Sequence, residues 1–165
     1  HHNGLMWGHY ADSHRGFVIG FRANHPWFDM RNRPDDPINH VEPVSYSKHR
    51  PQVVLSDIAN SSEEAKVAAV LYLTKSREWR YERERRLIRR LSDANEDSPG
   101  LYILQFPPDT VAEIILGYRM SYSDRAALAE VLDDPRFRHV VKFEAFLDER
   151  TYAMRRRLQA SVWWA

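Results

Sequence analysis

Apolar residues occur along the chain in short runs that are separated by polar residues, and most of these runs are typical of β-strands. The strands that they predict span residues 17–21, 41–47, 101–106, 111–116 and 140–147. Predicted helices are fewer, and they span residues 5–15, 61–75 and 124–132. Strands outnumber helices and do not alternate regularly with them, which indicates an α+β fold.

Two of these elements carry further local signals. In the first helix, Trp7, Tyr10, Ala11 and His14 fall at a spacing that places them on one face, and Gly16 is a natural end point. Core packing is the ordinary explanation of such a stripe, but each of the three ring side chains also has a polar group that needs a partner when buried. Residues 17–21 are short and apolar, which predicts a buried strand.

Three further signals concern the ends and edges of elements. Ser123 is the predicted N-cap of the helix that spans residues 124–132. Pro43 places the strand at residues 41–47 on a sheet edge, because proline cannot donate a ladder hydrogen bond. Residues 22–40 hold three prolines and predict a long loop.

The densest charge pattern lies in residues 79–88, Trp-Arg-Tyr-Glu-Arg-Glu-Arg-Arg-Leu-Ile. In a strand, Glu82, Glu84 and Arg86 would share one face, and two neighbouring carboxylates beside an arginine could form an acid–base or cation-stabilising site. In a helix, Glu82 and Arg86 would form an ordinary solvated pair four residues apart. Residue propensities favour the helix, and the pattern alone leaves both interpretations open.

Length and composition narrow the class of protein. The chain has 165 residues, the size of one domain, and we expect a single domain over residues 5–165. It begins with His1-His2 and not with methionine, so we interpret residues 1–4 as a tag or linker remnant and expect the domain to lack its N-terminal part.

Several kinds of chemistry are not indicated by the sequence. It contains no cysteine, which excludes disulfides and thiol catalysis, and its histidines lack the spacing of a metal site. No phosphate-binding glycine motif is present. The net charge of +1 gives no general attraction to nucleic acid or membrane, and no apolar run is long enough to span a bilayer. We therefore expect a cytoplasmic protein without a metal or a membrane partner.

Two motifs carry a resemblance to a known family. The first runs from Met6 to Phe21 and contains Trp-Gly-His-Tyr-Ala. The second runs from Tyr72 to Ile88 and contains Thr74-Lys75, Trp79 and Glu-Arg-Glu-Arg-Arg. Together they resemble the bacterial domain-of-unknown-function 2971 family over roughly residues 5–147, and residues 113–117 resemble a later strand of that family.

This family is in turn similar to the ADP-ribosyltransferase superfamily. The resemblance implies an ADP-ribosyltransferase-like fold of mixed, mainly antiparallel sheets with a few flanking helices, and it assigns residues 81–88 to a strand. It also implies NAD as substrate and a macromolecular acceptor, in a bacterial toxin or phage-defence effector. The superfamily's N-terminal NAD-binding motif has no counterpart here. A partner chain that supplies it, a missing N-terminal segment and loss of activity are three open alternatives.

The resemblance also implies a role for each candidate site residue. Glu84 would stabilise the oxocarbenium-like ribose, and Glu82 would orient or deprotonate the acceptor. Trp7 and Tyr10 would stack on nicotinamide, and His14 would donate or accept a ligand hydrogen bond. Arg86 would hold either the glutamate strand or the pyrophosphate.

Two alternatives stay open at this point. In the first, Glu82, Glu84 and Arg86 form a structural ion-pair ladder, and the domain is a non-catalytic recognition module of a defence or toxin system. In the second, the domain processes or binds RNA through its arginines, which is little supported by a net charge of +1. The arginines concerned are Arg77, Arg80, Arg83, Arg85 and Arg155–Arg157.

Overall fold

The computed structural model of the chain describes residues 3–29, 40–53 and 61–159. The chain forms two compact units, each built from helices and strands, which confirms the α+β class. The first unit consists of His1–Ala23 and Phe106–Ala165, and the second of Asn24–Gln105. The second unit is therefore inserted into the sequence of the first.

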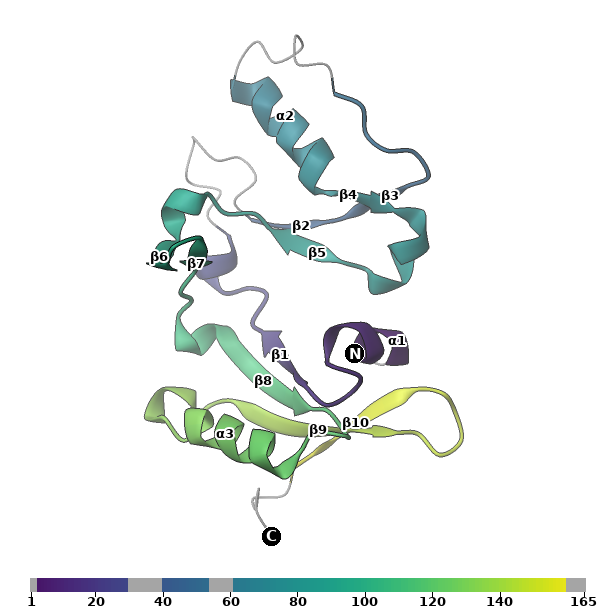
Figure 1. The fold of residues 1–165 in the computed structure, drawn as a ribbon, viewed down its shortest axis with the longest axis vertical. Coiled ribbons are helices and arrows are strands. Elements are labelled where there is room, and N and C mark those ends of the chain that lie inside the picture. The colour runs from purple at the N-terminus through teal and green to yellow at the C-terminus, as the bar shows by residue number, and fades with distance from the viewer. Residues whose placement is uncertain (1–2, 30–39, 54–60, 160–165) are drawn as a thin grey trace. The chain divides into compact units, whose positions relative to one another are not determined.

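A four-stranded sheet organises the first unit (Figure 1). β1 (Phe17–Phe21) pairs antiparallel with β8 (Val111–Leu116), and β8 pairs parallel with β9 (Val141–Leu147). β9 pairs antiparallel with β10 (Met154–Leu158). The sheet is thus mixed and mainly antiparallel, as the resemblance implied.

Two helices cover opposite faces of this sheet. α3 (Tyr122–Leu132) belongs to the core that contains Ile114 and Leu116, whereas α1 (Gly4–Tyr10) belongs to the core that contains Ile115. Successive residues of a strand point to opposite faces, so β8 is buried on both sides. This is why the apolar run at residues 114–116 is almost completely inaccessible to solvent.

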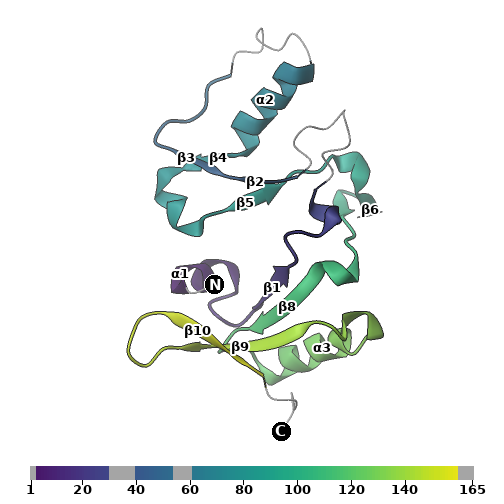
Figure 2. The ribbon, with the colours of Figure 1, turned by 180° about the vertical axis from the view of Figure 1, so that it is seen from behind.

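Short strand pairs and one longer helix make up the second unit. In it, α2 (Ser61–Tyr72) lies in sequence between β3 (Ser45–Ser47) and β4 (Thr74–Ser76), which pair in parallel. The antiparallel pair of β2 (Val41–Pro43) and β5 (Arg85–Leu87) lies beside it (Figure 2). A hairpin of β6 (Asn95–Ser98) and β7 (Leu101–Ile103) completes the set of strands.

Short 3₁₀ helices connect these elements in both units. They are η1 (Pro26–Phe28), η3 (Arg77–Glu82), η4 (Leu91–Asp93), η5 (Pro108–Thr110) and η6 (Pro135–Phe137). Part of the predicted loop at 22–40 lies outside the described residues, and η1 interrupts the part that is described.

The first helix is shorter than predicted. It ends at Tyr10, because the next turn contains three consecutive residues with positive φ, Asp12 (42°), Ser13 (52°) and His14 (70°). A close approach to Gly117 accompanies this turn, since a Cβ at that position would lie 2.1 Å from the His14 carbonyl oxygen. His14 therefore lies beyond the helix and not on its face.

Three other expectations also need correction. Residues 41–47 are two strands in two different strand pairs, with buried Val44 between them. β1 is an edge strand with alternating exposure, and not a buried one. The N-cap of α3 is Ser121, whose hydroxyl accepts the Asp124 N–H at 3.1 Å, so the helix begins earlier than the predicted cap at Ser123.

The strand predicted at residues 81–88 is partly confirmed. Residues up to Glu82 belong to η3, Arg83 is in the left-handed region (φ 49°), and β5 covers Arg85–Leu87. The strand at 111–116 is confirmed, and β9, α2, α3 and β7 match their predicted elements with shifted ends.

Candidate functional site

The backbone around residues 82–86 changes direction at Arg83. Its left-handed conformation is unfavourable for a residue with a Cβ, so surrounding contacts must hold it. Two hydrogen bonds fix the next residue: the Glu84 N–H donates to the Tyr46 hydroxyl at 2.8 Å, and the Val44 N–H donates to the Glu84 carbonyl at 3.0 Å. The turn at Arg83 thus connects η3 to β5 and fixes the backbone of Glu84.

Four charged side chains converge here, and we call Lys75, Glu82, Glu84 and Arg86 the glutamate cluster. The Lys75 ammonium contacts both carboxylates, Glu82 through a short hydrogen bond and Glu84 at 2.9 Å. Arg86 donates to Glu84 through Nε at 2.6 Å and through Nη2 at 3.2 Å, which is a bidentate pair. Each carboxylate therefore has at least one cationic partner.

The two glutamates differ in exposure. The Glu82 side chain is 3% exposed, whereas the Glu84 side chain is 27% exposed. Lys75 lies between them, and its ammonium is also 5.1 Å from the centre of the Trp79 ring. Arg86 is further held by the Tyr72 carbonyl oxygen, which accepts from its Nη1. Of the two carboxylates, Glu84 is the one that a ligand can reach.

The surroundings of the cluster keep its groups charged. The hydrogen bond from Arg86 is the main reason that the pKa of Glu84 is lowered to about 2; burial opposes this shift, and Lys75 adds to it. Burial lowers the pKa of Lys75, but its hydrogen bonds to Glu82 and Glu84 outweigh that effect and raise it. At neutral pH Glu84 is a fixed negative charge that can stabilise a developing cation.

The first unit contains the other predicted site residues. Trp7 is 2% exposed and packs in the core with Ala11, and its ring stacks on that of His14 with centroids 6.3 Å apart. Tyr10 is 60% exposed. The predicted stacking of Trp7 on nicotinamide needs an open ring face, which this conformation does not provide.

His14 lies between two aromatic rings. Its ring centroid is 5.0 Å from that of Tyr118, and its Nδ1 is buried without a hydrogen-bond partner in the part of the chain that the structure describes. Burial, with a contribution from Arg119, lowers the pKa of His14. A neutral imidazole is therefore expected at physiological pH.

The predicted residues thus form two groups. Glu82, Glu84 and Arg86 come together in the second unit, and Trp7 lies beside His14 in the first. Sequence reasoning assigned no role to Lys75, the fourth member of the glutamate cluster, or to Tyr46, whose hydroxyl accepts the Glu84 N–H. The Thr74-Lys75 pair in the second motif was the available signal for Lys75, whereas no local pattern indicated Tyr46.

Some other kinds of site are not found in the described residues. They contain no group of side chains that could hold a metal ion, and none of their helices is long and apolar enough to cross a membrane. The run Arg155–Arg157, which an RNA site would use, is paired with carboxylates of Asp148, Glu113 and Glu144. These pairs neutralise most of its charge.

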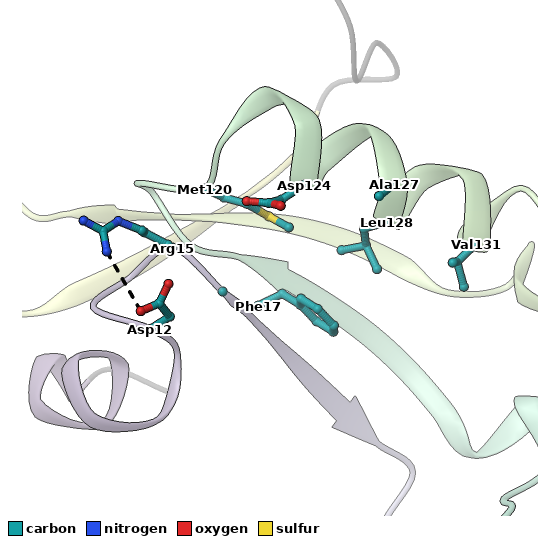
Figure 3. Close-up of a pocket in the computed structure, with 9 residues that line it drawn as sticks. Asp12, Arg15, Phe17, Met120, Asp124, Ala127, Leu128 and Val131 are labelled. Atoms are coloured by element: carbon teal, nitrogen blue, oxygen red, sulfur yellow. Dashed lines mark ion pairs between the residues drawn. The ribbon is translucent and has the colours of Figure 1, made fainter. Parts of the chain in front are cut away.

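A separate cavity of about 510 Å³ lies within the first unit (Figure 3). Phe17, Met120, Leu128 and Val131 form its apolar walls, together with Ala127 and Gly16. The charged residues that line it are Asp12, Arg15 and Asp124. The ion pair of Asp12 with Arg15 spans 3.9 Å. None of the predicted site residues lines this cavity.

Comparison with known proteins adds one match. A family model described as a protein of unknown function, DUF2971, matches residues 6–87. The matched range includes the first motif, all of the second except Ile88, and all four residues of the glutamate cluster. The comparisons with curated proteins and with solved structures found no match.

Proposed function

We propose that this chain, which belongs over residues 6–87 to the DUF2971 family of proteins of unknown function, has an NAD-dependent ADP-ribosyltransferase-like activity. Glu84 is its central catalytic residue. The observation that carries the proposal is the state of Glu84: an ionised, partly exposed carboxylate held by Arg86 and Lys75. The ADP-ribosyltransferase-like fold belongs to the same proposal.

The chemistry requires such a carboxylate. When the bond between nicotinamide and ribose breaks, its electron pair leaves with nicotinamide, and positive charge develops on the ribose. The acceptor then bonds to the ribose carbon and loses its proton. Glu84 would stabilise the cationic ribose through its negative charge and a hydrogen bond from a ribose hydroxyl. Because Arg86 and Lys75 already orient it, little reorganisation is needed in the transition state.

The other residues take roles that follow from their environment. Glu82 is buried against Lys75, so we assign it the positioning of Lys75 in place of the acceptor contact that the resemblance implied. Arg86 orients Glu84. Tyr10 is exposed and remains the predicted stacking residue for nicotinamide, with His14 as a hydrogen-bonding candidate. The macromolecular acceptor, the toxin or phage-defence role and the cytoplasmic location stay predictions.

A specific observation favours a second candidate function. Both glutamates are already paired with cations, and Glu82 is almost fully buried. Both features are typical of a structural ion-pair network. In this case the domain is a non-catalytic recognition module, and the cluster serves only to hold β4, η3 and β5 together.

The test measures nicotinamide release from NAD and NAD affinity by titration calorimetry. Glu84→Gln keeps the size of the side chain and removes its charge, so we expect release to fall about 100-fold or more. Glu78→Gln, an exposed change in the neighbouring η3, is the matched control and should release nicotinamide at the wild-type rate.

The outcomes separate the two candidates. Release by the wild type that Glu84→Gln abolishes supports the enzyme. Equal release by both would remove Glu84 from the mechanism. Neither binding nor release at millimolar NAD, in this chain and in a longer one that adds an N-terminal segment, would favour the recognition module.

A further inference from the structure

Another cavity, which is polar, lies in the second unit at the ends of two parallel strands. β3 and β4 run in the same direction, with Ser47 opposite Ser76, so their carboxyl ends meet at one edge. The cavity there has a volume of about 300 Å³. Its walls are Ser47, Lys48, His49, Arg50 and Pro51 after β3, and Thr74, Lys75 and Ser76 of β4.

The charged side chains that are described around this cavity are cationic. Lys48, Arg50 and Lys75 bring three cations to the cavity, and none of the described residues that line it carries a carboxylate. The charge of Lys75 is neutralised by Glu82 and Glu84. Lys48 and Arg50, in contrast, form no ion pair with any described residue. Two uncompensated cations on a concave surface favour an anion.

Hydroxyl groups add directional donors to this charge. The Ser47 hydroxyl oxygen accepts the His49 N–H at 3.0 Å, which leaves the hydroxyl hydrogen for a ligand. Thr74 brings a second hydroxyl. The Ser76 hydroxyl is already used, because it donates to Glu78. Cations together with hydroxyl donors match the oxygens of a phosphate group.

We infer that this cavity, lined by Lys48, Arg50, Ser47 and Thr74, binds a phosphate group, either as free diphosphate or as part of a nucleotide. Lys75 connects the cavity to the glutamate cluster, since its ammonium contacts Glu82 and Glu84 and leaves one N–H for the anion. The inference does not need ADP-ribosyl transfer, because none of its contacts involves Glu84 directly.

The experiment titrates inorganic pyrophosphate and ADP into the full chain at low salt, by calorimetry. The test variant is the double change Lys48→Glu with Arg50→Glu, and the matched control is Lys66→Glu with Arg80→Glu. All four residues are exposed and lie in the second unit, and the two variants carry the same net charge. A difference between them therefore reports local contacts and not the general field.

We expect the test variant to bind pyrophosphate about 100-fold more weakly than the wild type, and the control to stay within about 3-fold. Tighter binding of ADP than of pyrophosphate would assign the site to a nucleotide, and equal binding would assign it to the diphosphate alone. Equal weakening in both variants, or no binding by the wild type, would overturn the inference.

Two further measurements serve as independent controls for this test. Amide shifts of the wild type on adding pyrophosphate should concentrate at residues 47–50 and 74–76, which needs no variant, and shifts elsewhere would contradict the site. Glu84→Gln should not weaken pyrophosphate binding, because it removes a negative charge beside Lys75. A failed phosphate site and a failed transferase are therefore distinguishable.

Discussion

Glu84 is the residue on which the candidate site depends, and its negative charge also contributes to the stability of the fold. Arg86 and Lys75 keep it ionised, with a pKa of about 2 in the folded chain against an ordinary value of 4.5. A carboxyl whose pKa is lowered by folding stabilises the fold above its ordinary pKa, and that contribution is lost as pH falls toward the lowered value.

The resulting prediction concerns the free energy of unfolding of the wild type and of Glu84→Gln. The difference between them should be greatest above about pH 5 and should shrink toward zero near pH 2, because protonated Glu84 no longer gains from its cations. Chemical denaturation across this pH range measures it. The pKa values of Glu144 and Asp148 are also lowered, by hydrogen bonds with arginines, so the difference between the two proteins is the quantity to follow. A constant difference would contradict the lowered pKa.

Helix α3 shows how one side chain decides where an element begins. Ser121 has an extended backbone, and its hydroxyl accepts the Asp124 N–H and donates to the Asp124 carboxylate. The first of these bonds satisfies the Asp124 N–H, one of the N–H groups that the first turn of a helix leaves without a partner. Ser123 has the same side chain but already lies inside the helix.

We therefore predict different effects for two similar substitutions. Ser121→Ala should lower the free energy of unfolding by about 1 kcal/mol, whereas Ser123→Ala should change it by less than about 0.5 kcal/mol. Urea denaturation of both variants measures this pair. Equal losses would mean that the cap is not where the structure has it.

At the scale of the whole molecule, the two units differ in their cores. The buried apolar residues of the described chain lie in the first unit, with the single exception of Val44. The first unit has two apolar cores on the two faces of its sheet. The described part of the second is held by short strand pairs and by the ion pairs of the glutamate cluster.

This difference predicts uneven hydrogen exchange. Amides of β8 at residues 114–116 should exchange only when the first unit unfolds, whereas amides of β3 and β4 should exchange at least about 100-fold faster, because few buried contacts hold them. Exchange followed by mass spectrometry or by NMR measures the ratio. Equal protection in both units would show that they unfold together, as the single domain expected over residues 5–165 requires.

The sequence by itself determined the elements whose signals are local. An apolar run at 111–116, a capped amphipathic segment before Leu132 and a charged stretch at 79–88 identified β8, α3 and most of the glutamate cluster. Each of these depends on side chains that are neighbours along the chain, so their pattern is visible without any fold.

Only the tertiary structure decided which distant residues meet. Lys75 reaches both glutamates because the left-handed turn at Arg83 brings them to β4, and the helix α1 ends early beside Gly117, more than 100 residues away. β1 pairs with β8 across the whole inserted unit. Such contacts depend on backbone pairing and close approach between distant segments, which no local pattern of polarity records.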